Sequence, residues 1–249
     1  MKSHQDYVTL GQQKRAPRPG RSGRGQEKSR RIVQAAMRQF ARSGYQAARV
    51  EDIASDLGIA KGSVFQHFGS KEALFLAAYK EAVGSFSAYL DAPGDVLSRG
   101  FFATLEYWLL RTERLLRENW VPYRMTLIGN YASDLALRRE IRRFLVAEDP
   151  YGVLPFVRMG IARGEVRRDV DPELTASILE WTVERFQDAL LSEELDPGLF
   201  PHPGAREKTR ARVDQFLRVL RGGLAPSPRP PARRKPKVRG GAPRPASRF

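Results

Sequence analysis

Residues 61–68, KGSVFQHF, have the composition of a short helix with one face suited to double-stranded DNA. At about 100° per residue, Gly62, Ser63 and Gln66 fall on one small, polar face. Such a face can come close to the floor of a groove, and a glutamine amide can pair with adenine N6 and N7. Two basic residues at the ends could meet base edges or phosphates: Lys61 and His67.

The residues just before this segment predict the elements that would hold it in place. Apolar side chains follow the i, i+3, i+4, i+7 rule of a short helix at Val50, Ile53, Ala54 and Leu57. Gly58 suits a tight turn, so residues 50–68 have the proportions of a helix-turn-helix. We expect Val64 and Phe68 to pack into Ile53, Leu57 and Phe40. On an ordinary surface, Gln66 would be merely solvated and His67 would be a helix-end histidine packed on Phe68.

The rest of the chain reads as helix, and no alternating strand pattern is bounded by turns. The spacing predicts a helix over residues 27–43 and another from a Ser70 cap to about Leu90. Further starts are predicted at Gly94-Asp95, for one helix through Leu116, and at Asp149-Pro150 and Asp171-Pro172, each as an N-cap followed by proline. A last helix is predicted over residues 205–221, stopped by Gly222-Gly223. We therefore predict an all-α fold.

The net charge of +15 lies mainly in the two ends of the sequence. Residues 1–26 carry six basic and one acidic side chain, and residues 225–249 carry eight basic and none acidic. Residues 27–224, with 29 basic and 27 acidic side chains, are close to neutral. Because both ends are rich in Arg, Pro and Gly, we predict that they are disordered. They could strengthen DNA binding by releasing counterions, or they could simply be solvated.

Composition excludes several classes of site. Without Cys there is no disulfide, thiolate nucleophile or cysteine-ligated zinc, and the three His are far apart in the sequence. We expect no metal, no cofactor and no catalytic residue, because no nucleophile–base pair stands out. No segment approaches the roughly 20 apolar residues that span a bilayer, and the N-terminal residues lack the apolar stretch of a secretory signal. We expect a cytoplasmic, nucleoid-associated protein with no membrane contact.

Residues 27–76 closely resemble the TetR family of transcriptional regulators. The matching features are an apolar-Ala-Phe series ending in Gly-aromatic, an Ile-Ala pair, a Gly-apolar turn, a Lys-Gly-hydroxyl helix start, a His-Phe pair and Ser-Lys-Glu. These are Ile32, Ala36, Phe40, Gly44 and Tyr45, then Ile53-Ala54, Gly58-Ile59, Lys61-Gly62-Ser63, His67-Phe68 and Ser70-Lys71-Glu72. The resemblance implies a three-helix DNA-binding domain followed by a helical ligand-binding and dimerisation domain.

The resemblance also implies roles for individual residues. Lys61, Gly62 and Gln66 would face base edges, and four residues would lie along the phosphates: Ser63, Phe65, His67 and Lys71. The chain departs from the family pattern in three places. Ala60 cannot cap the recognition helix, Phe65 lacks the usual tyrosine hydroxyl, and Arg49 replaces a capping Ser or Thr. The guanidinium of Arg49 could still reach the same phosphate.

The second half of the sequence resembles the family more loosely, through residues 163–174 and 213–224. For an effector pocket we name Trp108, Tyr123, Arg124 and Tyr151, with Asn130 as a further polar group, although these residues could equally be ordinary core. In the family the last two helices pair with those of a second copy. The residues expected at or beside that interface are Trp181, Phe186, Leu190, Phe216 and Leu220, together with Val213.

These observations predict a disordered basic arm (1–26), a DNA-binding domain (27–73), an effector-binding and dimerisation domain (74–224) and a disordered basic tail (225–249). The expected function is that of a homodimeric regulator, a repressor rather than an activator, that binds a palindromic operator and is released by a small molecule. Two alternatives remain. One is a sequence-tolerant, chromosome-associated protein without an effector, and the other is a helical enzyme or carrier with a relic helix-turn-helix.

Overall fold

A computed structural model describes residues 21–87, 92–200 and 206–226, which form helices and turns without a strand. The helices are α2 (Arg21–Ala47), α3 (Val50–Asp56), α4 (Lys61–Phe68), α5 (Lys71–Ser87), α6 (Gly94–Ser98), α7 (Phe101–Glu118), α8 (Trp120–Asn130), α9 (Leu135–Glu148), α10 (Val153–Ala162), α11 (Pro172–Leu191) and α12 (Arg206–Leu224). The predicted all-α class is confirmed. Within the described ranges, no helix has both the length and the apolarity to cross a membrane.

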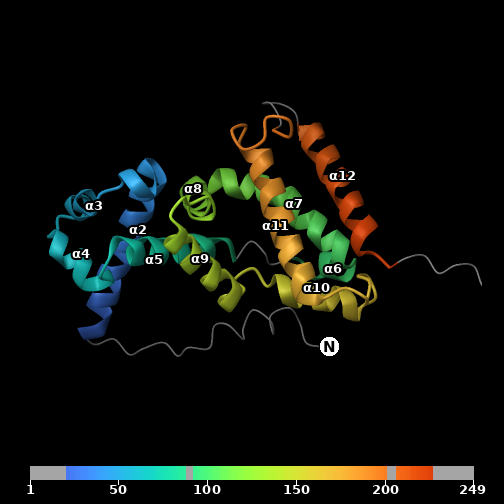
Figure 1. The fold of residues 1–249 in the computed structure, drawn as a ribbon, viewed down its shortest axis with the longest axis horizontal. Coiled ribbons are helices and arrows are strands. Elements are labelled where there is room, and N and C mark those ends of the chain that lie inside the picture. The colour runs from blue at the N-terminus through green and yellow to red at the C-terminus, as the bar shows by residue number, and fades with distance from the viewer. Residues whose placement is uncertain (1–20, 88–91, 201–205, 227–249) are drawn as a thin grey trace, which may run out of the picture.

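Two apolar cores organise the molecule (Figure 1). The first core joins α2, α3, α4 and α5 at one end, and α8 and α9 pack against the same core. The second core joins α7, α10, α11 and α12 at the other end. A smaller cluster connects the two through Phe86, Leu116, Tyr123 and Leu127. Helix α5 therefore extends from the helix-turn-helix into the middle of the molecule.

The first core forms as the apolar spacing predicts. Phe40, Ile53 and Val64 are buried together, and the ring of Phe40 meets that of Phe75 edge-on with 5.0 Å between centroids. Leu57 and Phe68 pack against the same core while remaining partly exposed. The position of α4 is thus fixed by its buried Val64, as the sequence indicates.

Two predicted boundaries of the N-terminal helices are confirmed. Regular geometry in α2 ends at Gly44, whose φ of 76° belongs to the left-handed region that glycine adopts most easily. The hydroxyl of Ser70 accepts a hydrogen bond from the Ala73 N–H at 3.1 Å and so caps α5. The helix α2 begins at Arg21, earlier than predicted, so residues 21–26 are helical. The predicted end of α5 near Leu90 lies outside the described residues. So do most of the predicted basic arm and tail, at residues 1–20 and 227–249.

The prediction of one helix from Gly94 through Leu116 is wrong. Helix α6 ends at Ser98 and α7 begins at Phe101, with Gly100 between them at a φ of 103°. The carboxylate of Glu165 accepts a hydrogen bond from the Phe101 N–H, and a Cβ at Gly100 would collide with it. A distant residue therefore caps α7, and local sequence could not reveal this cap.

The prediction that Asp149-Pro150 starts a helix is also wrong in position. Asp149 ends α9 in the left-handed conformation, with a φ of 37°, and α10 begins only at Val153. Aspartate tolerates this backbone conformation better than most residues. Its carboxylate still accepts a hydrogen bond from the Val153 N–H at 3.0 Å, so the backbone of Asp149 ends α9 and its side chain caps α10. Asp171-Pro172, by contrast, starts α11 as predicted, and the Asp171 carboxylate accepts from the Leu174 N–H at 2.7 Å.

The last helix does not stop at Gly222-Gly223, as the sequence predicts, but continues to Leu224. Leu224 packs against the second core, and its carbonyl accepts a hydrogen bond from the Arg167 N–H at 2.8 Å. Two glycines disfavour a helix by about 1 kcal/mol each relative to alanine, and tertiary contacts override that preference here.

Candidate nucleic-acid interface and interior cavity

The turn between α3 and α4 is held by backbone hydrogen bonds. Gly58 has a φ of 62°, and its N–H donates to the Ser55 carbonyl at 3.0 Å. The next N–H, of Ile59, donates to the Ala54 carbonyl at 3.0 Å. With Val64 buried in the core, this turn fixes the direction of α4. Any side chain on the outer face of α4 is therefore presented on a rigid support.

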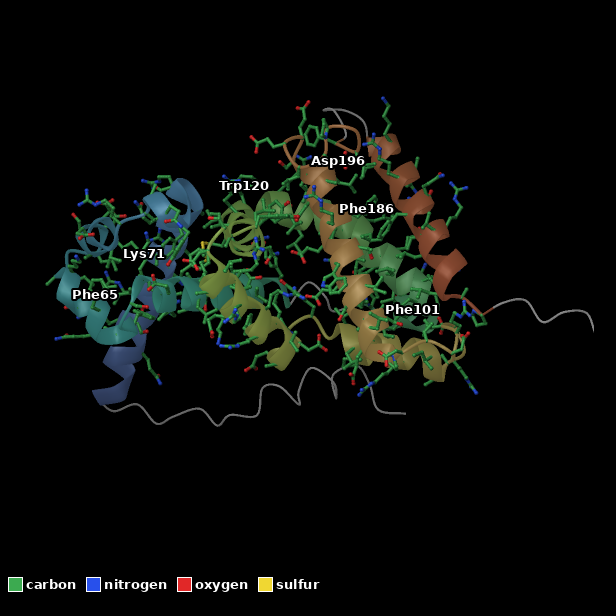
Figure 2. All side chains as sticks on the ribbon, in the orientation of Figure 1. Phe65, Lys71, Phe101, Trp120, Phe186 and Asp196 are labelled. Carbon is green, nitrogen blue, oxygen red and sulfur yellow. The ribbon has the colours of Figure 1, made fainter. Side chains whose placement is uncertain are left out.

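The outer face of α4 carries the small and polar residues that the sequence assigned to base reading. Gly62, Gln66 and His67 are exposed, whereas Ser63 and Phe65 are half-buried. A Cβ placed on Gly62 would meet nothing within 4 Å, so this point of the surface is open. Figure 2 shows Phe65 at the end of the molecule formed by α3 and α4. The face is free to approach a flat or grooved partner.

Two basic side chains, Lys61 and Arg49, flank this face in different ways. The ammonium of Lys61 lies 2.7 Å from a carboxylate oxygen of Glu51, but both side chains are half-exposed. Exposed pairs of this kind contribute at most about 1 kcal/mol, so a phosphate could replace Glu51. Arg49 is exposed and makes no cap hydrogen bond to α3, as its departure from the family pattern predicts. Ala60 likewise leaves α4 without a side-chain cap.

Lys71 has a structural contact in addition to its predicted place near phosphates. Its ammonium donates to the Gln46 carbonyl at 3.1 Å and lies 4.9 Å from the centre of the Tyr45 ring. The Tyr45 hydroxyl donates to the Glu72 carboxylate at 3.0 Å, and burial together with this carboxylate raises the pKa of Tyr45. The start of α5 is thus tied to the end of α2 beside the reading face (Figure 2).

A cavity of about 180 Å³ lies where the two cores meet. Residues of α5, α7, α8, α9, α10 and α11 border it, and this volume holds several water-sized groups. Its aromatic lining consists of Tyr79, Phe86, Trp108, Tyr123, Tyr151 and Phe156. Three of the four predicted pocket residues are therefore at the cavity. Arg124, the fourth, is not among the lining residues, whereas Asn130 is.

Three carboxylates border the cavity from one helix, at every fourth position of α11: Glu180, Glu184 and Asp188. Asp188 is buried and accepts hydrogen bonds from the hydroxyls of Tyr123 and Tyr131, both at 2.9 Å. The Asn130 amide donates to the Glu184 carboxylate, and the Asn130 carbonyl oxygen accepts from the Tyr79 hydroxyl at 2.6 Å. Tyr79 of α5, Asn130 of α8 and Glu184 of α11 thus form one hydrogen-bonded chain across the cavity wall.

Enclosure makes these carboxylates harder to ionise. Burial, followed by the negative charges of Asp188 and Glu180, raises the pKa of Glu184 to about 7. Burial also raises the pKa values of Glu180 and Asp188. The guanidinium of Arg142, 3.8 Å from Glu180, acts in the opposite direction on both glutamates. Sequence reasoning missed this cluster, although the spacing of four residues on one helix could have indicated it.

The comparison with known families bears on the helix-turn-helix directly. Residues 32–78 match the sequence model described as bacterial regulatory proteins, tetR family. This range contains α3, α4, most of α2 and the first part of α5. The chain belongs to the TetR family. The chain is therefore a DNA-binding transcriptional regulator.

Curated relatives, both named as transcriptional repressors, extend the similarity beyond this domain. The HTH-type transcriptional repressor AcnR of Corynebacterium glutamicum is 27% identical over 180 residues, which cover 68% of this chain and 84% of the relative. The HTH-type transcriptional repressor DhaR of Mycobacterium sp. (strain GP1) is 28% identical over 206 residues, which cover 79% of this chain and 91% of the relative.

Solved structures share the fold of the whole body. A putative TetR-family regulator from Shewanella sp. PV-4 superposes with a TM-score of 0.61 at 16% identity, covering 80% of this chain and 98% of the other. The regulator FadR from Bacillus subtilis, solved in complex with stearoyl-CoA, gives a TM-score of 0.59 at 21% identity and covers 77% of this chain and 96% of the other. At these identities the likeness describes the fold alone.

In this TetR-family chain the residues predicted for the dimer interface lie in two kinds of environment. Trp181 is half-exposed on α11, whereas Phe186 and Leu190 are buried inside the protomer. Phe216 of α12 stacks on Phe186 with 4.1 Å between ring centroids, and Leu220 is partly buried beside them in the second core. Two residues that the sequence reasoning omitted from the interface are exposed near Trp181 on α11: Leu174 and Ile178.

Replacing Glu184 with Gln is expected to remove a pH-dependent loss of stability. Below about pH 4.5 this carboxyl is protonated in the folded and unfolded states alike, so it contributes no difference. As the pH rises to about 7, the carboxyl ionises in the unfolded state before it ionises in the folded state. The free energy of unfolding of the wild type therefore falls by roughly 2 kcal/mol relative to that of Glu184→Gln. Urea unfolding of both proteins across this range measures the effect. Parallel stability curves would contradict it, and the exposed Glu173→Gln serves as control.

Proposed function

We propose that this TetR-family regulator is a repressor that acts as a homodimer, binds a palindromic operator through two copies of α4, and leaves it when a small molecule enters the cavity. The names of the curated relatives, which are repressors, support the direction of regulation. The observation that carries the DNA-binding part is the open, polar face of α4, with Gly62 and Gln66 exposed on a rigid support. Such a protein works in the cytoplasm, on the nucleoid.

The surface of α11 supports the dimer. Leu174, Ile178 and Trp181, at i, i+4 and i+7, form an apolar stripe with 57%, 43% and 50% of each residue exposed. Val219 of α12 is also exposed. An exposed apolar stripe on a long helix is typical of a surface that a second copy covers. The buried Phe186 and Leu190 would support this surface from behind.

The position of the cavity supports the release by a ligand. Tyr79 and Phe86 belong to α5, which begins directly after the recognition helix, and both border the cavity. A ligand that changes the contacts of these two residues changes the position of α5 and with it the spacing of the two reading helices. A ligand that prefers the DNA-incompetent arrangement by about 1–3 kcal/mol would weaken operator binding roughly 5- to 150-fold.

Selection of bound duplexes from a random pool, with the full-length chain, tests the proposal. We expect a palindrome whose half-sites are separated by about one helical turn or a multiple of it. On that sequence, Lys61→Ala and Gln66→Ala are each expected to cost roughly 1–3 kcal/mol and to cost less on random DNA. Fluorescence anisotropy at fixed salt measures both losses. Equal losses on both duplexes would defeat the base-reading role, and failure to select any sequence would favour the sequence-tolerant alternative.

A further inference from the structure

The charges around the cavity are one-sided. Glu180, Glu184 and Asp188 border it, and its described lining includes no Lys, Arg or His. The remaining lining consists of aliphatic and aromatic residues with a few neutral polar groups. An enclosed, largely apolar space with several carboxylates is a costly arrangement unless something positive occupies it. A positively charged ligand would favour the ionised form of these carboxylates, so their presence favours cations over other ligands.

The three carboxylates differ in their partners within the protein. Asp188 accepts hydrogen bonds from Tyr123 and Tyr131, and Glu180 lies 3.8 Å from the guanidinium of Arg142. Glu184 has only the neutral amide of Asn130 as a hydrogen-bond donor among the described residues. Glu184, in the middle of the cluster, therefore has one neutral donor, whereas Asp188 has two hydroxyl donors and Glu180 has a guanidinium close by.

A second, independent feature points to a ligand. Tyr151 is partly buried and borders the cavity. No hydrogen bond among the described residues involves its hydroxyl, so this group is available to a ligand in the cavity. Together with Trp108 and Tyr123 it also offers aromatic rings on which a cation can rest.

On the basis of the proposed effector role, we propose that the cavity of this chain binds an organic cation, a quaternary or protonated amine with an apolar body. The positive group lies against Glu184, and the apolar body contacts Trp108, Phe156 and the leucines of α7. An anionic ligand would bring a further negative charge beside three carboxylates, and a neutral one would leave Glu184 with the Asn130 amide alone. Charge therefore distinguishes the ligand classes more sharply than shape does.

Isothermal titration calorimetry with the full-length chain tests this inference through three small compounds. These are benzyltrimethylammonium, its uncharged carbon isostere neopentylbenzene, and the anion phenylacetate. The cation is expected to bind at least tenfold more tightly than either of the others. Glu184→Gln, which keeps the shape of the side chain and removes a buried charge, is expected to weaken cation binding at least tenfold. Neopentylbenzene should bind both proteins equally.

Glu173→Gln is the matched control, because it removes the same charge from an exposed position on α11. It is expected to bind the cation as the wild type does. Equal affinities for the cation and its isostere, or a Glu184→Gln protein that keeps the affinity for the cation, would overturn the inference. Thermal unfolding of each variant checks that the fold is intact.

A separate measurement distinguishes this inference from the proposed function. Anisotropy of a labelled operator is followed while the cation is added. If the cation binds in a way that depends on Glu184 but leaves the operator complex unchanged, the cation site is supported and release by an effector is contradicted. Release of the operator by other compounds, with no binding of the cation, would retain the effector role and reject the cation.

Discussion

Replacing Gly62 with Glu is expected to abolish DNA binding, specific and non-specific alike, without destabilising the protein. Gly62 is exposed on the outer face of α4, and a Cβ there meets nothing within 4 Å, so the folded chain has room for the side chain. A glutamate in the first turn of a helix is also favoured over glycine by propensity and by the helix dipole. Against DNA, the same carboxylate blocks close approach and faces phosphates. Like charges at an interface cost several kcal/mol, which corresponds to a loss of roughly a hundredfold or more.

The control for this prediction is Gly84→Glu. Gly84 is likewise an exposed helical glycine at which a Cβ meets nothing within 4 Å, and it lies on α5, away from the recognition helix. The two variants have the same net charge, so a difference between them reports position and not charge. Anisotropy with the selected operator and with random DNA measures binding, and calorimetry measures thermal unfolding. A Gly62→Glu protein that binds DNA like the control would show that α4 is not the reading element.

The helix-turn-helix could be predicted from sequence because its determinants are local. Ile53, Leu57 and Val64 are close together in the chain, and the turn at Gly58 needs only a backbone conformation that glycine supplies. The exposure of Gln66 follows from the helical period once Val64 is buried. The same locality explains why Ser70 and Asp171 were recognised as caps, since each binds an N–H three residues ahead.

The polar side of the cavity could not be predicted in this way. Glu184 meets Asn130, and Asp188 meets Tyr123, across sequence separations of 54 and 65 residues. A pattern within α11 shows that the carboxylates share a face, but not that this face is turned inward. Most acidic positions on a helix are solvated. Without the tertiary structure, the sequence therefore favours solvent-exposed carboxylates on α11. Helix boundaries failed for the same reason at Gly100, where the capping carboxylate belongs to Glu165.

The aromatic residues show how far composition alone can lead. Trp108, Tyr123 and Tyr151 were named for a pocket on residue type, and all three border the cavity. The same reasoning named Phe186 for the interface, yet Phe186 stacks on Phe216 inside one protomer. Large apolar side chains serve cores, pockets and interfaces alike, and only their exposure in the folded chain separates these uses.

Exposure on α11 leads to the second large effect. Changing both Ile178 and Trp181 to Glu is expected to make the chain monomeric, because each is about half-exposed within the apolar stripe and two copies would bring four new negative charges together. The protomer should stay folded, since neither residue belongs to the buried part of the second core. A monomer presents one reading helix at a time. Operator affinity is therefore expected to fall by about 10²- to 10⁴-fold, the usual gain from joining two binding modules.

Leu135→Glu with Val146→Glu is the matched control, because it adds the same two charges at exposed apolar positions on α9. Sedimentation velocity gives the oligomeric state of each protein, and anisotropy gives its operator affinity. If the stripe is the dimer surface, only the α11 variant loses both the dimer and the high operator affinity. Its residual DNA binding is then the weak, salt-dependent binding of a single reading helix. An α11 variant that remains dimeric would place the interface elsewhere. Loss of operator affinity in a protein that is still dimeric would instead assign α11 to the coupling between the cavity and α5.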